Sequence, residues 1–252
     1  MNMEKRREQM VALINREGSV SFNRLKEAFQ NVSEMTLRRD LEFLDRAKRI
    51  IRTHGGARSV DILVGTDDLF LKRSTRNAGE KKLVAEKALS LLHENTTVYI
   101  DSGSTCTEFA RVLSDGPYMI FTGSISCALE MARLQQAQVH IVGGVLNAAS
   151  LCMNGVSTMR MLENINFQTV FLGATGYHSG RGFTCGSAEE SELKRLLIRR
   201  AEKVVLLMDS QKVGVTSTFT FAAPEDVDVL VTYGDMDEKT RREFERAGVV
   251  VL

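Results

Sequence analysis

The chain has 252 residues, enough for two domains of ordinary size that each bury a core. Its 33 Lys+Arg nearly balance its 32 Asp+Glu. No apolar run is long enough to span a bilayer, and the first residues carry charge where a signal peptide needs an apolar segment. We therefore expect a cytoplasmic protein with no membrane partner. The four cysteines lie far apart without a C-x-x-C pair, which favours reduced, mostly buried thiols over zinc ligation.

Charge is unevenly distributed along the chain. Residues 1–58 hold 13 Lys+Arg against 8 Asp+Glu, a net charge of +5, whereas the remainder holds 20 against 24, a net charge of −4. A basic N-terminal part on an acidic body predicts a nucleic-acid partner for the N-terminal part alone.

Three short helices are predicted in this basic part. Amphipathic patterns cover Lys5–Arg16 and Phe22–Gln30, and a third helix begins at Glu34. Ser33 is expected to be the N-cap of the third helix, its hydroxyl accepting from a free backbone N–H, a contact worth about 1 kcal/mol. The tight connection between the second and third helices predicts a helix-turn-helix, whose second helix enters the major groove of DNA.

The third helix has one apolar and one polar face. Leu37, Leu41 and Leu44 recur at the spacing of a buried face. The residues expected to point away from that face are Met35, Arg38, Arg39 and Glu42. A solvated helix surface could also carry two arginines, as most charge pairs do.

A basic wing is predicted after the third helix. Arg49–Thr53 alternates as a short strand, and His54, Gly55 and Gly56 suit the turn that follows it. Together with the charge asymmetry and the core that three helices can form, the wing favours DNA binding over a plain solvated surface.

The body alternates β-rich apolar runs with helical patterns. The expected strands are Thr97–Asp101, Tyr118–Thr122, Val139–Val142, Thr169–Ala174, Val204–Asp209 and Val229–Tyr233. The clearest expected helices are Lys81–Leu92, Thr107–Leu113 and Ala188–Ala201. This alternation predicts a Rossmann-like α/β fold with a mainly parallel sheet, which binds ligands beyond the carboxyl ends of its strands.

Small and hydroxylated residues follow five of the expected strands, in segments 101–107, 122–124, 143–144, 173–176 and 209–212. Such a loop before a helix can surround a phosphate with backbone N–H groups and hydroxyls. Lys194 and Lys212 could supply cations, although they could equally be surface lysines. Each loop by itself could also be an ordinary turn.

These residues resemble the DeoR family of bacterial transcriptional regulators. The resemblance rests on VSEMTLRRDL and RTHGGA in the basic part. In the body it rests on DSGST, VGG, FLGATG, the E-x-x-x-K of Glu190 and Lys194, and D-S-x-K at Asp209. It implies a winged helix-turn-helix joined to a domain that senses sugar phosphates, a fold similar to ribose-5-phosphate isomerases and CoA-transferases, and a homo-oligomer.

We therefore expect a DNA-binding domain over residues 1–58, a packed connector over 59–77 and an effector domain over 78–252. The residues expected at the DNA are Ser33, Met35, Thr36, Arg38, Arg39, Arg52 and His54. The residues expected at the effector are Asp101, Ser102, Gly103, Ser104, Thr105, Gly143, Gly144, Lys194, Asp209 and Lys212. The chain departs from the family pattern at Gly123, where the family has an asparagine, and at Tyr233, where it has an aspartate.

The function this implies is repression of a carbohydrate-utilisation operon, relieved by a phosphorylated sugar, with no cofactor. An isomerase-like enzyme fused to a DNA-binding head is the alternative, but no nucleophile and base stand at a suitable spacing, and an isomerase has no evident use for such a head. A scaffold whose loops are turns only is the third interpretation.

Overall fold

The computed structural model describes residues 3–17, 19–47, 49–53, 55–59, 70–75, 77–234 and 236–252. The chain forms two compact units, residues 1–66 and residues 67–252, here called the head and the body. Of the residues discussed above, His54 and most of the connector (60–69 and 76) lie outside the described ranges.

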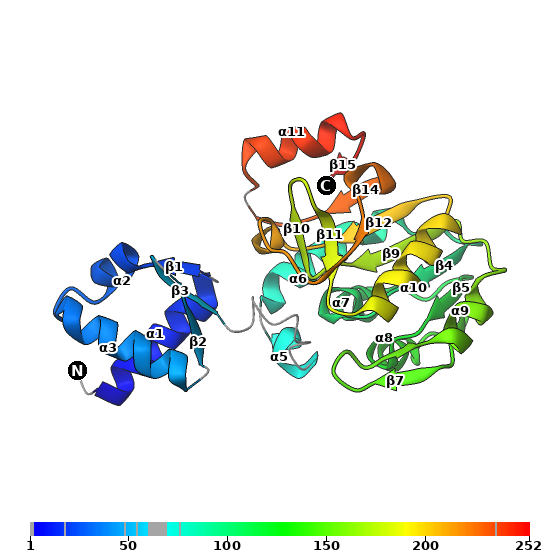
Figure 1. Cartoon of the computed structure of the whole chain (residues 1–252). Helices are drawn as coiled ribbons and strands as arrows, with labels where there is room; N and C mark the ends of the chain where they lie inside the picture. Colours follow the sequence, from blue (N-terminus) through cyan, green and yellow to red (C-terminus); the bar gives the residue numbers. More distant parts are fainter. Residues whose placement is uncertain are drawn as a thin grey trace. The chain divides into compact units, whose positions relative to one another are not determined.

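The head is a three-helix unit with a small antiparallel sheet of strand order β1-β3-β2 (Figure 1). Its elements are α1 (Met3–Glu17), β1 (Ser19–Ser21), α2 (Phe22–Ala28), α3 (Glu34–Arg46), β2 (Ile50–Thr53) and β3 (Gly56–Ser59). All three predicted helices are confirmed. Helix α2 ends two residues earlier than expected because Phe29 leaves the helical conformation, with φ −124° and ψ 50°.

The start and the apolar face of α3 are as predicted. The Ser33 hydroxyl accepts from the Thr36 backbone N–H at 3.2 Å. Leu37, Leu41 and Leu44 are buried in one core with side chains from α1 and α2. Because this face is fully used in packing, the opposite face of α3 is available for a partner.

The wing is the β2–β3 hairpin, and β3 lies between β1 and β2. Gly56 is required here, since a Cβ on it would lie 2.0 Å from the Val20 carbonyl oxygen. Strand β3 runs to Ser59, one residue past the expected domain end at 58, and the two compact units divide after Thr66.

The body is built on a seven-stranded sheet of order β15-β14-β12-β9-β4-β5-β6, in which every pair is parallel. Its strands are β4 (Thr97–Ile100), β5 (Met119–Thr122), β6 (Gln138–Ile141), β9 (Thr169–Gly173), β12 (Val204–Leu207), β14 (Val229–Val231) and β15 (Val250–Val251). The six predicted strands are all present, and β15 was missed because two residues carry no periodicity.

Helices cover both faces of this sheet (Figure 1). The helices of the body are α5 (Phe70–Thr75), α6 (Ala78–Ala88), α7 (Ser104–Val112), α8 (Ile125–Met131), α9 (Val156–Leu162), α10 (Ala188–Arg199) and α11 (Glu238–Arg246), with short 3₁₀ turns η1 (Leu89–Leu91), η2 (Ser210–Lys212) and η3 (Pro224–Asp226). Side chains alternate along each strand: Val98 and Ile100 of β4 pack with α6, α7 and α8, whereas Tyr99 packs in the core shared with α9, α10 and α11. The body is therefore a three-layer α/β/α unit.

Short strands of the body also lie outside the seven-stranded sheet and were not predicted. They are β7 (Val145–Asn147), β8 (Cys152–Asn154), β10 (Gly176–His178), β11 (Gly182–Cys185) and β13 (Phe219–Ala222). All four cysteine thiols are free and buried, as expected. No helix within the described ranges is both long and apolar enough to cross a bilayer.

Candidate functional sites in the head and the body

The outward face of α3 carries the residues expected at DNA. Met35, Arg38 and Arg39 are exposed, and 63% of Met35 is accessible to solvent. The Ser33 hydroxyl caps the helix and lies 2.9 Å from the Thr36 hydroxyl. Ser33 therefore orients α3, and the three exposed side chains remain available for a partner.

A buried carboxylate holds α3 against α1. Asp40 is 2% exposed and accepts from Arg6 Nε at 2.6 Å and from Arg7 Nε at 2.7 Å. Two adjacent arginines of α1 thus bind a single carboxylate of α3, which fixes the position of α3 in the head. Sequence reasoning missed this role, although Asp40 falls between apolar residues at a spacing that points inward.

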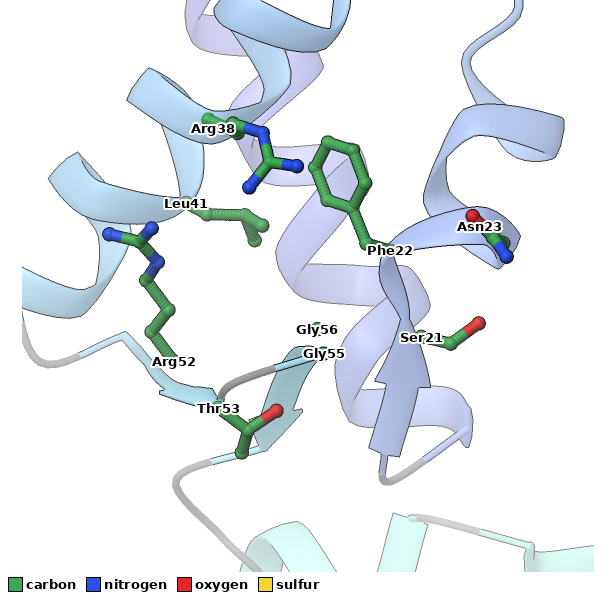
Figure 2. A pocket seen from close by; sticks show the side chains of 9 residues that line it. All are labelled: Ser21, Phe22, Asn23, Arg38, Leu41, Arg52, Thr53, Gly55 and Gly56. Carbon is green, nitrogen blue, oxygen red and sulfur yellow. The ribbon is translucent and has the colours of Figure 1, made fainter.

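The head has a pocket between α3, the start of α2 and the wing, shown in Figure 2. Its volume is about 290 Å³. The Arg38 guanidinium lies over the Phe22 ring, 4.3 Å from the ring centroid, and Arg52 reaches the same pocket from β2. The Arg52 backbone N–H donates to Asp45 at 2.9 Å, which ties the wing strand to α3.

In the body, the strand order reverses direction between β4 and β9. From β4 the chain continues through β5 and β6 on one side, then returns to β9 and continues through β12, β14 and β15 on the other. Crevices at such a switch point, beyond the carboxyl ends of the strands, are where α/β sheets bind ligands. Asp101 follows β4 and Gly173 ends β9, so both lie at this switch point.

Asp101 and Lys194 form a buried ion pair at the switch point. Lys194 Nζ donates to Asp101 and to the Gly173 carbonyl oxygen (3.0 Å), and it lies 3.2 Å from a Glu190 carboxylate oxygen. The Gly173 backbone N–H donates to the same Asp101 oxygen at 3.0 Å. Burial disfavours the charge on Lys194, but Asp101 and Glu190 outweigh it and raise the lysine pKa well above its usual value. Lys194 is therefore a fixed cation.

Helix α7 begins three residues earlier than the sequence predicted, so Ser104 and Thr105 belong to its first turn. Gly103 makes this possible because its φ of +108° suits glycine, and nothing lies within 4 Å of the place where a Cβ would be. The N-cap residue of α7 is Gly103, which has no side chain with which to cap the helix. Thr105 is 3% exposed, and its hydroxyl has no hydrogen-bond partner among the described residues.

A second lysine lies beyond the end of β12. Lys212 Nζ donates to the Ala174 carbonyl oxygen at 2.8 Å and lies 3.9 Å from an Asp209 carboxylate oxygen. Ala174 directly follows Gly173, so Lys212 and Lys194 contact successive carbonyl groups of one loop. The structure thus brings Asp101, Lys194, Asp209 and Lys212 together around the end of β9.

Ser102 is buried between β4 and α7, and the last two predicted effector residues lie at β6. Gly143 and Gly144 follow this strand, two positions from β4 in the sheet, and the Thr158 hydroxyl donates to the Gly143 carbonyl oxygen at 2.8 Å. A Cβ on Gly144 would lie 2.2 Å from the Thr158 hydroxyl oxygen, so this position requires glycine. These two glycines shape a neighbouring loop instead of joining the charged cluster.

The two departures from the family pattern also lie at carboxyl ends of strands. A Cβ on Gly123 would lie 3.2 Å from the Met153 carbonyl oxygen and 3.3 Å from the Tyr99 hydroxyl oxygen, so any side chain there would displace its neighbours. Tyr233 follows β14 and is 42% exposed, and Lys87 Nζ lies 5.9 Å from its ring centroid.

The described part of the connector packs on the body. Helix α5 packs against α7, and the Phe70 backbone N–H donates to the Ala149 carbonyl oxygen at 2.9 Å. Helix α5, the first described element of the body in chain order, therefore contacts α7, and the first turn of α7 contains Thr105.

A winged helix-turn-helix with outward arginines is typical of DNA-binding domains, and the body places charged and hydroxylated side chains at the switch point of its sheet, where α/β sheets bind ligands. One chain that combines these two belongs to the class of ligand-responsive DNA-binding regulators. The family follows from the sequence matches: the description "DeoR-like helix-turn-helix domain" matches residues 6–62, and "DeoR C terminal sensor domain" matches residues 76–233. The chain belongs to the DeoR family of transcriptional regulators.

Whole-length relatives agree with this. The HTH-type transcriptional regulator GlpR of Haloferax volcanii is 32% identical over 98% of this chain and 96% of its own. The lactose phosphotransferase system repressor of Streptococcus mutans is 28% identical over 96% of each chain.

Among solved structures, ribose 5-phosphate isomerase A from Methanocaldococcus jannaschii is 16% identical with a TM-score of 0.40, covering 54% of this chain and 55% of that one.

Proposed function

We propose that the protein is a repressor of a carbohydrate-utilisation operon and leaves its operator when a phosphorylated sugar binds the body. Membership of a family of transcriptional regulators supports the DNA-binding half of this proposal. Relatives whose names refer to sugar systems, such as the lactose phosphotransferase system repressor, support the sugar. A DNA-binding role also implies that the protein works in the cytoplasm.

In the head, the proposed DNA contacts are Met35, Thr36, Arg38, Arg39 and Arg52. The exposure of the arginines and the packing behind α3 support them. The assignment of His54 rests on the sequence alone.

The observation that carries the effector proposal is the first turn of α7. A buried hydroxyl without a partner costs free energy unless a ligand completes it, and free N–H groups at a helix N-terminus attract a phosphate. Thr105 provides this hydroxyl beside the switch point. We infer that the phosphate group of the effector contacts residues 102–105. We also infer that the hydroxyl groups of the effector's sugar face Asp101, Asp209 and Lys212.

The experiment combines a ligand screen with a Thr105→Val variant. Full-length protein is tested for thermal stabilisation by a panel of phosphorylated trioses, pentoses and hexoses, because a ligand of the folded state raises stability by RT ln(1 + [L]/Kd). Val keeps the shape of Thr and removes only the unpartnered hydroxyl. We expect Thr105→Val to fold normally and to bind the best sugar phosphate roughly tenfold more weakly or worse, as for a lost hydrogen bond to a charged group.

The matched control is Thr240→Val. Thr240 also lies in the first turn of a body helix, but its hydroxyl donates to Asp237 at 2.7 Å. This variant should lose about 1 kcal/mol of stability and keep the affinity for the sugar phosphate. If Thr105→Val binds the sugar phosphate as tightly as wild type, the phosphate does not bind at α7.

Relief of repression requires that the sugar phosphate bind more tightly to the arrangement of the protein that does not bind DNA than to the arrangement that does. We propose that α5 carries this preference, because it packs against α7. We also propose that the protein acts as a homo-oligomer whose heads read half-sites about one or more helical turns apart. Sedimentation with and without duplex DNA tests the assembly.

We further propose that the body binds its ligand without converting it. A lysine that acts as a general base needs a pKa near neutrality, whereas the carboxylates around Lys194 raise its pKa. Prolonged incubation of the best ligand with the protein should leave its NMR spectrum unchanged. Conversion to an isomer would favour the enzyme instead.

A further inference from the structure

The two adjacent arginines of α3 point in different directions. With the buried face defined by Leu37, Leu41 and Leu44, and about 100° of rotation per residue, Arg39 points nearly opposite that face. Arg38 points roughly a quarter turn to the side. Both are exposed, so neither is needed for the core of the head.

The two side chains also differ in what holds them. The Arg38 guanidinium stacks on Phe22, whose ring is partly buried against the core of the head. Figure 2 shows the ring facing the guanidinium. No described residue forms a hydrogen bond, an ion pair or a ring contact with the Arg39 side chain. Arg38 is thus held in place before a ligand arrives.

The pocket beside Arg38 suits an anion. Arg38 and Arg52 enter it from different elements, and Ser21, Asn23 and Thr53 are its polar neighbours (Figure 2). None of the described residues that line it is acidic. Its volume of about 290 Å³ exceeds the roughly 30 Å³ that one water occupies several times over, so a phosphate with attached waters fits.

We propose that this pocket binds one phosphate of the DNA backbone through Arg38 and Arg52, with Phe22 as the residue that positions Arg38, and that Arg39 reads base edges. When the outward face of a recognition helix lies in the major groove, its flanks face the sugar-phosphate strands. Phosphate contacts set the register, whereas base-edge contacts specify the sequence. This assignment rests on the proposed DNA-binding function and divides the roles of two neighbouring residues within it.

The first test compares Arg38→Ala with Arg39→Ala in the full-length chain. The probes are the tightest duplex selected from a random-sequence library, its single base-pair variants, and a random duplex, each titrated over a range of salt. Arg38→Ala should weaken binding to all duplexes by the same factor and reduce the slope of log Kd against log salt by about 1. Arg39→Ala should remove discrimination at one or two base pairs, roughly tenfold or more.

The second test isolates Phe22. Leu keeps an apolar side chain without an aromatic face, whereas Tyr keeps the face. Phe22→Leu should weaken binding to every duplex about two- to fivefold, and Phe22→Tyr should restore it. In the Arg38→Ala background Phe22→Leu should have no further effect. Thermal unfolding of each variant shows whether the head is intact.

Each outcome has one meaning. If Arg38→Ala removes discrimination at a particular base pair, Arg38 reads a base and the assignment is wrong. If Phe22→Leu weakens binding equally with and without Arg38, Phe22 does not position it. If the wild-type chain enriches no duplex over random DNA, the proposed DNA-binding function itself fails, independently of how the arginines divide their roles.

Discussion

At the scale of single residues, charge is placed in two different ways. In the head, Arg38 and Arg39 are exposed, where solvent screens them and a partner can reach them. In the body, Lys194 is 1% exposed and is held by Asp101 and the Gly173 carbonyl. Two buried charges are tolerated only when their geometry compensates the loss of water, so the Lys194 ammonium depends on the acceptors that Asp101 and Gly173 supply.

The contribution of this pair to stability can be measured. Lys194→Met leaves the Asp101 carboxylate buried without its cation and should lower the free energy of unfolding of the body by about 3–5 kcal/mol. Adding Asp101→Asn should recover part of that loss, because the uncompensated charge is then removed. Urea unfolding of the single and double variants checks this. Equal stability of the single variant and the wild type would show that the pair contributes nothing.

At the scale of elements, α3 is positioned from two sides. Its leucines pack into the core, and Asp40 ties it to Arg6 and Arg7 of α1. The wing is tied to the same helix through Asp45. A recognition helix must be held firmly, since a small displacement of its axis moves every side chain in the groove.

We therefore expect Asp40→Ala to lower the stability of the head by about 3 kcal/mol, because it leaves two part-buried guanidinium groups without their carboxylate. DNA binding should weaken with it, although Asp40 itself is buried. Glu42→Ala on the same helix is the control: its ion pair with Arg46 is exposed, and its loss should cost less than about 0.5 kcal/mol. Chemical unfolding, monitored with a spectroscopic probe in the head, gives the free energy of unfolding of the head for each variant.

At the scale of the whole molecule, the head and the body each have cores of their own. The core of the head contains side chains of α1, α2 and α3, whereas the two cores of the body lie on opposite faces of its sheet. Units with separate cores can unfold separately, so a single two-state transition is not expected.

This predicts how ligands stabilise the protein. The best sugar phosphate should raise the unfolding temperature of the body alone. A selected duplex should raise the unfolding temperature of the head alone, because each ligand stabilises the fold that it binds. Calorimetry of the full-length chain, with hydrogen exchange to assign each transition, is the measurement. A rise in the head transition on adding sugar phosphate without DNA would contradict it.

Local pattern was enough where the physics is local. The cap at Ser33, the leucine face of α3 and the six apolar runs of the main sheet were all predicted, because capping and side-chain alternation depend on residues a few positions apart. The short strands outside the main sheet of the body were not predicted. The strands β7, β8 and β10 are too short to show a period, and their pairing partners stabilise them.

The sequence by itself determined the class of the protein: the helix-turn-helix, the parallel α/β body, and the small polar residues after its strands. The tertiary structure alone decided which of these residues meet. It joined Asp101 to Lys194 across 93 positions, placed Gly143 and Gly144 two strands away, and set Phe22 beneath Arg38. The physical reason is that periodicity fixes the face on which a side chain lies, whereas strand order and packing fix its neighbours.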